Sequence, residues 1–61
     1  MRVNGHEIKR FADLRYANLY GATMQEAQSS GANLTGADLR SVNLTNTNLT
    51  GATMPDGTLH D

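Results

Sequence analysis

Residues 12–21 read ADLRYANLYG, and residues 32–41 read ANLTGADLRS. Both stretches consist of five-residue units in which alanine comes first, Asp or Asn second and leucine third. The same register continues along the chain, and every leucine occupies its third position: Leu14, Leu19, Leu34, Leu39, Leu44, Leu49 and Leu59. A fixed period is the sequence signature of a repeat architecture, so we expect residues 12–61 to form a solenoid.

The five-residue period favours extended chain over helix. Five residues advance an α-helix by about 140°, which would scatter the leucines around it. In an extended segment, residues two apart share a face, so each alanine and its leucine point inward and the polar residue between them points outward. The last two positions of each unit must then turn the chain. Several of them hold residues that tolerate corner conformations: Gly21, Gly31, Gly36, Gly51, Ser41 and Asn46.

The units ADLRY, ANLYG, ANLTG and ADLRS resemble those of the pentapeptide repeat family, whose pattern is A-(D/N)-L-x-x. The resemblance covers residues 12–61 and implies a right-handed quadrilateral β-helix with four units per coil. Coils stack at a strand spacing of about 4.8 Å, so about two and a half coils form a stub about 12 Å tall. We therefore expect an all-β, single-domain protein with an N-terminal hairpin cap (residues 1–11) and a pentapeptide repeat β-helix (residues 12–61).

Residues 20 apart should stack in columns inside this β-helix. The predicted core ladder consists of Leu14, Leu19, Met24, Leu34, Leu39, Leu44, Leu49, Met54 and Leu59. Ser29 occupies the same register position, where its hydroxyl would face the core. A buried hydroxyl needs a hydrogen-bond partner, so we expect a local distortion or a bound water at Ser29.

The two ends of the chain carry turn signals. Asn4-Gly5 between short alternating flanks predicts a two-residue hairpin that pairs Val3 with His6 and places Arg2 opposite Glu7 as a charge pair. At the other end, residues 55–57 read PDG and predict a turn. Residues 54–58, MPDGT, resemble a terminal element of bacterial members of the family, which predicts a natural end there.

A chain of this length buries little surface and is marginally stable alone. The open ends of a solenoid also expose apolar columns and unpaired backbone. We therefore predict a homodimer that associates end to end. The candidate association surface comprises Val3, Ile8, Phe11, Met54, Pro55 and Leu59.

Composition narrows the possible chemistry. The chain has 61 residues, a net charge of −1 and no cysteine. It contains no long apolar run, so we expect neither a transmembrane segment nor a signal peptide, and a cytoplasmic protein from a bacterium or a phage. His6 and His60 lie near opposite ends of the chain. We therefore expect no catalytic site, no bound metal and no cofactor.

The sequence supports three hypotheses about function. The leading one is a non-enzymatic structural or protein-interaction module with an unidentified protein partner. The alternative, implied by the resemblance, is a DNA mimic that binds DNA gyrase or another type II topoisomerase and confers quinolone resistance. A 12 Å stub would need about seven negative charges to imitate duplex DNA. Residues 16–61 carry one arginine against four acidic residues, a net charge of −3.

The third hypothesis is nucleic-acid binding by the basic stretch near the N-terminus. It contains Lys9, Arg10, Arg15 and Tyr16. Tyr16 and Tyr20 flank Arg15, and a cation–π contact within the protein explains that pattern equally well. An ordinary outer surface is the simpler interpretation, so we do not expect a nucleic-acid partner.

Overall fold

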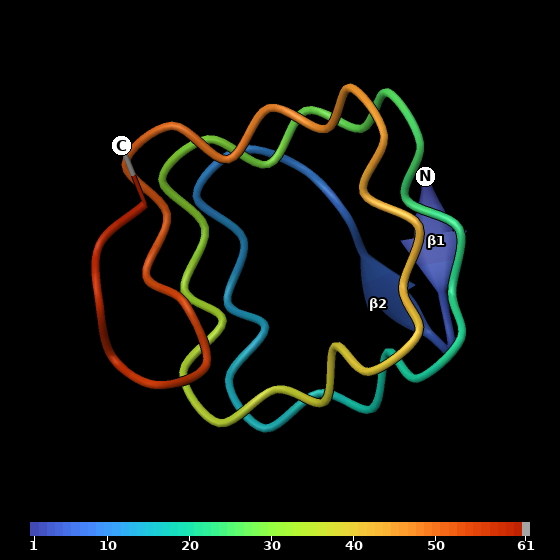
Figure 1. Ribbon diagram of the computed structural model, residues 1–61, viewed down its shortest axis with the longest axis horizontal. Coiled ribbons are helices and arrows are strands. Elements are labelled where there is room, and N and C mark those ends of the chain that lie inside the picture. Colours follow the sequence, from blue (N-terminus) through green and yellow to red (C-terminus); the bar gives the residue numbers. More distant parts are fainter. Residues whose placement is uncertain (61) are drawn as a thin grey trace.

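The computed structural model describes residues 1–60. The chain winds repeatedly around one axis, and successive coils follow nearly the same outline (Figure 1). Parallel bridges join each coil to the next, always between residues 20 apart, so that one coil takes four five-residue units: Asp13–Asn33, Asn18–Asp38, Thr23–Asn43, Gln28–Asn48 and Asn33–Thr53. The expected β-helix is confirmed.

Each coil is held to the next by a repeated set of backbone hydrogen bonds. Leu14 donates its N–H to the Asn33 carbonyl at 2.8 Å, and Asn33 donates to the Ala12 carbonyl at 2.9 Å. The corner residue Tyr16 adds a third bond, to the Thr35 carbonyl at 2.9 Å. Since only one residue per unit forms a bridge and the others turn the chain, the solenoid contains bridges and no long strands.

The corners between residues 11 and 51 have a left-handed backbone at the last residue before each new five-residue unit. These residues have φ between 57° and 74°: Phe11, Tyr16, Gly21, Glu26, Gly31, Gly36, Ser41, Asn46 and Gly51. Glycine adopts this conformation without a steric cost. Phe11, Tyr16 and Glu26 adopt it against their intrinsic preference, because the coil must turn there.

The core holds most of the predicted ladder. Leu14, Leu19, Met24, Leu34 and Leu49 are buried, and they alternate with buried alanines. Leu39, Leu44 and Met54 are half-buried and pack against this cluster.

Leu59 does not join the core ladder, and this part of the prediction is wrong. Its side chain is 71% exposed. After Pro55 the chain turns through Gly57, whose φ is 87° and whose N–H donates to the Met54 carbonyl. Leu59 then bridges Thr53 in the antiparallel sense instead of stacking on Leu39. In Figure 1 this last segment (red) swings outside the outline of the coils.

Ser29 occupies the core position that its register predicts. It is fully buried, and its Oγ has no hydrogen-bond partner within the described residues. The expected distortion is absent, because the Gln28–Asn48 bridge next to it is regular and Ser29 donates its N–H to the Asn48 carbonyl at 2.8 Å. The backbone therefore keeps the period even where the side chain does not suit the core.

The N-terminal hairpin is formed by β1 (Arg2–Val3) and β2 (His6–Glu7). Its predicted register is confirmed, with Val3 opposite His6 and Arg2 opposite Glu7. Asn4 and Gly5 both have positive φ, as a type I′ turn requires. The predicted ion pair is wrong: Glu7 pairs with the N-terminal amino group at 3.2 Å, and Arg2 donates to the Gly5 carbonyl.

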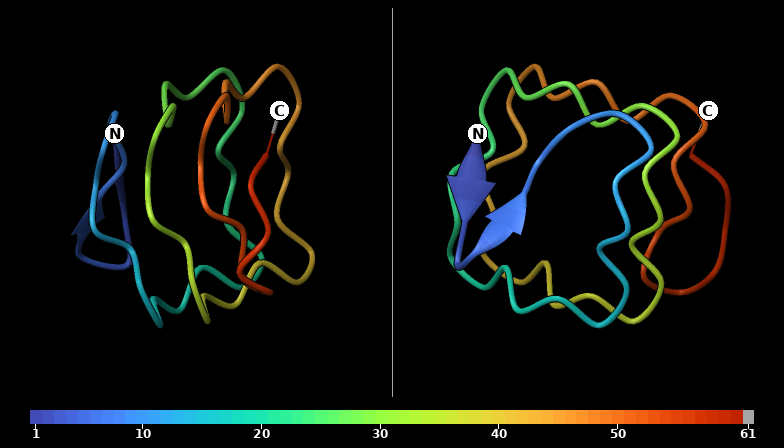
Figure 2. Two further views of the ribbon diagram at one scale, coloured as in Figure 1. Left: turned by 90° about the vertical axis from the view of Figure 1, so that its left-hand side faces the viewer. Right: turned by 180° about the vertical axis from the view of Figure 1, so that it is seen from behind.

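The hairpin and the last segment lie at opposite ends of the solenoid (Figure 2). Ile8, just after β2, is only 4% exposed, and Val3 packs against the core cluster. The Asn4 amide donates to the Asn18 carbonyl at 2.7 Å. Residues before the repeats therefore pack against the N-terminal end of the core.

Candidate interaction surface

Unpaired backbone groups gather at the C-terminal end of the solenoid. In the first coil, each core position and each corner donates its N–H to the following coil. In the second coil, Leu34 and Gly36 still donate to the carbonyls of Thr53 and Pro55. Five further equivalent N–H groups have no backbone acceptor within the described residues: Leu39, Ser41, Leu44, Asn46 and Leu49. The carbonyls of Ala37, Val42 and Thr47 likewise receive no hydrogen bond from residues 1–60. This edge can pair with another extended chain.

The same end exposes part of the apolar core. Leu19 and Met24 are fully buried, because the second coil covers them. Leu39 and Leu44, their equivalents one coil later, are only half-buried. The C-terminal end therefore combines apolar side chains with a hydrogen-bonding edge.

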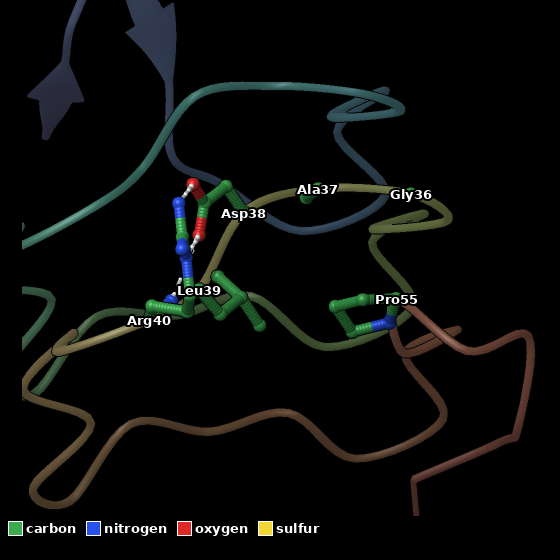
Figure 3. A pocket seen from close by; sticks show the side chains of 6 residues that line it. All are labelled: Gly36, Ala37, Asp38, Leu39, Arg40 and Pro55. Atoms are coloured by element: carbon green, nitrogen blue, oxygen red, sulfur yellow. Dashed lines mark hydrogen bonds and ion pairs between the residues drawn. The ribbon is translucent and has the colours of Figure 1, made fainter.

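An open depression of about 590 Å³ lies on this end. Its lining consists of Gly36, Ala37, Asp38, Leu39, Arg40 and Pro55. In Figure 3 the side chains of Leu39 and Pro55 lie apart within it, and the Asp38–Arg40 ion pair stands beside Leu39. The depression follows the side of the coil that a regular third coil would cover, so it results from the turn after Pro55.

Residues 58–60 border this end as a short extended segment. Met54 donates to the Thr58 carbonyl at 2.7 Å, and His60 donates to the Ala52 carbonyl at 2.8 Å. These bonds use one edge of the segment. The backbone N–H and C=O of Leu59 point to the other edge and have no partner within residues 1–60.

The six residues predicted to form an association surface do not lie together. Ile8 is buried and therefore unavailable, and Val3 is half-buried at the N-terminal end. Phe11 is 79% exposed, where its ring lies over Gly31. The remaining three gather at the C-terminal end: Met54, Pro55 and Leu59. The sequence predicted unpaired backbone at an open end but did not locate it in residues 37–49, because a regular third coil would have covered part of this edge.

Comparison with known proteins agrees with this architecture. Eight copies of the sequence pattern described as pentapeptide repeats match residues 12–51. The chain belongs to the pentapeptide repeat family. No curated protein matches the chain.

A solved pentapeptide repeat structure is similar to this chain over most of its length. It is HetL, a pentapeptide repeat protein involved in heterocyst differentiation regulation from the cyanobacterium Nostoc sp. strain PCC 7120. The two share 45% sequence identity with a TM-score of 0.79, and the match covers 80% of this chain. It covers 21% of HetL, so the chain spans about a fifth of the length of that protein.

The polar side chain at the second position of these units accepts hydrogen bonds from the residue two places later, at the corner. In the Asn-Leu-Thr units, the Asn33 side-chain oxygen accepts the N–H of Thr35 at 3.1 Å and its hydroxyl at 2.7 Å. Asn43 accepts from Thr45 in the same way. These contacts are local turns of the Asx type.

The Asp-Leu-Arg units replace this hydroxyl contact with an ion pair. Arg15 binds Asp13 and Arg40 binds Asp38, each at 2.9 Å, with two side-chain hydrogen bonds per pair. The arginine hydrogen bonds lower the pKa of both carboxyls below its usual value. Aspartate therefore occurs here where the residue two places later can neutralise its charge.

The aromatic residues of the first coil lie on the outer surface. The predicted contact between arginine and tyrosine involves Arg40, whose guanidinium lies 5.3 Å from the centre of the Tyr20 ring. Arg15 pairs with Asp13 instead. Tyr16 is 78% exposed, and its ring lies over Gly36. These contacts support the packing of neighbouring coils on the outside.

Residues 1–60 contain no group of three His, Asp or Glu side chains that is placed to hold a metal ion. No helix within the described residues is long and apolar enough to cross a membrane. Of the features in residues 1–60, the C-terminal end is the best candidate for an interaction.

Proposed function

We propose that the protein is a non-catalytic interaction module that associates with itself through the C-terminal end of its solenoid. The observation that supports this proposal is the open edge of the second coil. Among residues 1–60, the N–H groups of Leu39 and Leu44 have no backbone acceptor, although their equivalents in the first coil, Leu19 and Met24, are paired. An unpaired strand edge is a template for pairing with another chain.

Burial of apolar surface also favours self-association through this end. Leu39, Leu44 and Met54 are half-buried at this end, and Leu59 is largely exposed. Covering these side chains removes apolar area from water, which stabilises an assembly. A chain this small benefits strongly, because it buries a low fraction of its own surface.

We also infer that the N-terminal hairpin acts as a cap. Ile8 is buried against the first coil, and Asn4 donates to the Asn18 carbonyl there. Strands at a sheet edge are protected from wrong pairing by such covers. The right-handed winding that the family resemblance implies stays a prediction.

The charges weigh against DNA mimicry. Glu7, Asp13 and Asp38 each bind a positive group, namely the N-terminal amine, Arg15 and Arg40. Such pairing reduces an acidic field that is already weak for a solenoid of this height. We therefore do not propose binding to a topoisomerase.

Light scattering and sedimentation measurements on the purified chain between 1 and 100 µM (on the order of typical Kd values for small interfaces) test self-association. We expect a shift from monomer to dimer with rising concentration. A monomer throughout this range would refute the proposal. Hydrogen exchange identifies the end involved, since dimer formation should protect the amides of Leu39, Ser41 and Leu44.

A further inference from the structure

We propose that the depression beside Leu39 binds Leu59 of a second copy of the chain, and that the exchange is reciprocal. This inference rests on the proposed self-association and names the contact that produces it. The depression is lined by residues 36–40 and Pro55. Leu59 lies four residues after Pro55 in the chain.

The first argument is that the column of Leu19 and Leu39 is incomplete. Leu19 is fully buried beneath Leu39, and Leu39 is only half-buried. The five-residue register assigns the next position of this column to Leu59. Within one chain Leu59 cannot reach it, because the antiparallel bridge to Thr53 holds it elsewhere. A leucine from another copy can occupy the vacant end of the column.

The second argument is that the backbone groups on the two sides complement each other. The Leu39 N–H points to the open edge and lacks an acceptor among residues 1–60, and the Leu59 carbonyl lacks a donor there. In an antiparallel pair, directly opposed residues place their side chains on the same face. Pairing Leu39 with the second copy's Leu59 therefore satisfies both backbone groups and brings the two leucine side chains together.

The third argument concerns closure. Each copy offers one depression and one exposed Leu59 at the same end of the solenoid. Two copies related by a two-fold axis exchange these elements reciprocally, and no further copy is needed. The hairpin at the opposite end blocks continued stacking, so the assembly stops at a dimer.

Cysteine cross-linking tests the contact directly, because the chain has no cysteine of its own. Leu39→Cys and Leu59→Cys variants are mixed at equal concentration and oxidised. Random pairing already favours the linked heterodimer over either linked homodimer, so we expect the heterodimer to exceed this statistical share clearly. Arg40→Cys, at an exposed residue that also lines the depression, replaces Leu39→Cys if the core substitution impairs folding. A preference for the Leu59→Cys homodimer would overturn the inference, because the two tails would then meet each other.

Leu59→Asp provides an independent test. The side chain is exposed in the single chain, so we expect an unchanged circular dichroism spectrum, together with at least tenfold weaker dimerisation. Phe11→Asp is the matched control: it removes an exposed apolar residue at the opposite end, and aspartate tolerates the left-handed backbone there. We expect this control to dimerise like the wild type.

The outcomes separate the two proposals. A wild-type chain that stays monomeric refutes self-association and the Leu59 contact together. A wild-type dimer that survives Leu59→Asp leaves self-association standing and overturns the Leu59 contact alone.

Discussion

The ring of Tyr16 lies over Gly36, one coil further along the solenoid. The ring carbon Cδ1 is 2.5 Å from the point that a Cβ atom on residue 36 would occupy. Glycine is therefore favoured at this corner for two reasons, the left-handed φ of 71° and the space taken by the ring. Phe11 has the same relationship to Gly31. The aromatic residues of the first coil thus pack against backbone corners of the second.

Gly36→Ala should destabilise the fold more than Gly51→Ala does. Both glycines have φ above 70°, so both substitutions cost about 1 kcal/mol for the left-handed backbone. A Cβ at residue 51 meets nothing within 4 Å, whereas at residue 36 it displaces the Tyr16 ring. Thermal unfolding of the two variants measures the difference.

Tyr16→Ala combined with Gly36→Ala supplies the control for this prediction. Removing the ring should abolish the extra loss, so that the double variant shows a non-additive free energy of unfolding. Equal losses in Gly36→Ala and Gly51→Ala would show that the ring does not rest on Gly36 in solution.

Ser29→Ala should stabilise the protein by about 1 kcal/mol, since it removes a buried hydroxyl without a partner. Denaturant unfolding gives the value, and Ser30→Ala is the matched control at the neighbouring half-buried residue. A clear loss of stability in Ser29→Ala would mean that the hydroxyl makes a hydrogen bond in solution.

Thr47→Val should destabilise the fold by about 1 kcal/mol. The Thr47 hydroxyl donates to the Met24 carbonyl at 2.6 Å across neighbouring coils, and valine keeps the shape but not the donor. Thr47→Ser retains the donor and loses only a methyl group. Chemical unfolding should therefore show a lower free energy of unfolding for Thr47→Val than for the wild type. Equal stability of the wild type and the valine variant would show that this hydrogen bond does not contribute to stability.

Acid should weaken the fold through its exposed carboxyls. Hydrogen bonds from Arg15, Arg40 and Thr58 lower the pKa of Asp13, Asp38 and Asp56 respectively. The unfolded chain then binds more protons than the folded chain, so this contribution is present above the unfolded pKa of about 4 and is lost as the pH falls through the lower folded values.

Melting temperatures between about pH 7 and pH 2 measure this effect, with a decline expected below about pH 4. Asp38→Asn keeps the turn acceptor that asparagine provides elsewhere in the repeats and removes one titrating group. Its decline should be shallower than that of the wild type. A decline identical to the wild type would show that Asp38 does not contribute to the acid sensitivity.

The candidate site was only partly predictable from sequence. The register places Met54 and Pro55 near the C-terminal end, because their positions follow from counting units. From the sequence, Ile8 could either cover the first coil or form part of a contact surface, and in the structure it is buried. That the Leu39 N–H finds no acceptor among residues 1–60 depends on where the chain leaves the coil, which no local pattern specifies.

Sequence alone determined the five-residue repeat of extended segments and turns and the Asn4-Gly5 hairpin, because a repeated unit and a two-residue turn are local signals that each segment carries by itself. The β-helix with four units per coil followed from the family resemblance. Only the tertiary structure decided that Leu59 is exposed and does not stack in the core. Its register position favours the core, but the Gly57 turn and the pairing of Thr53 with Leu59 compete with stacking on Leu39. That competition between a local turn and a distant column leaves one leucine exposed and one edge open at the same end of the protein.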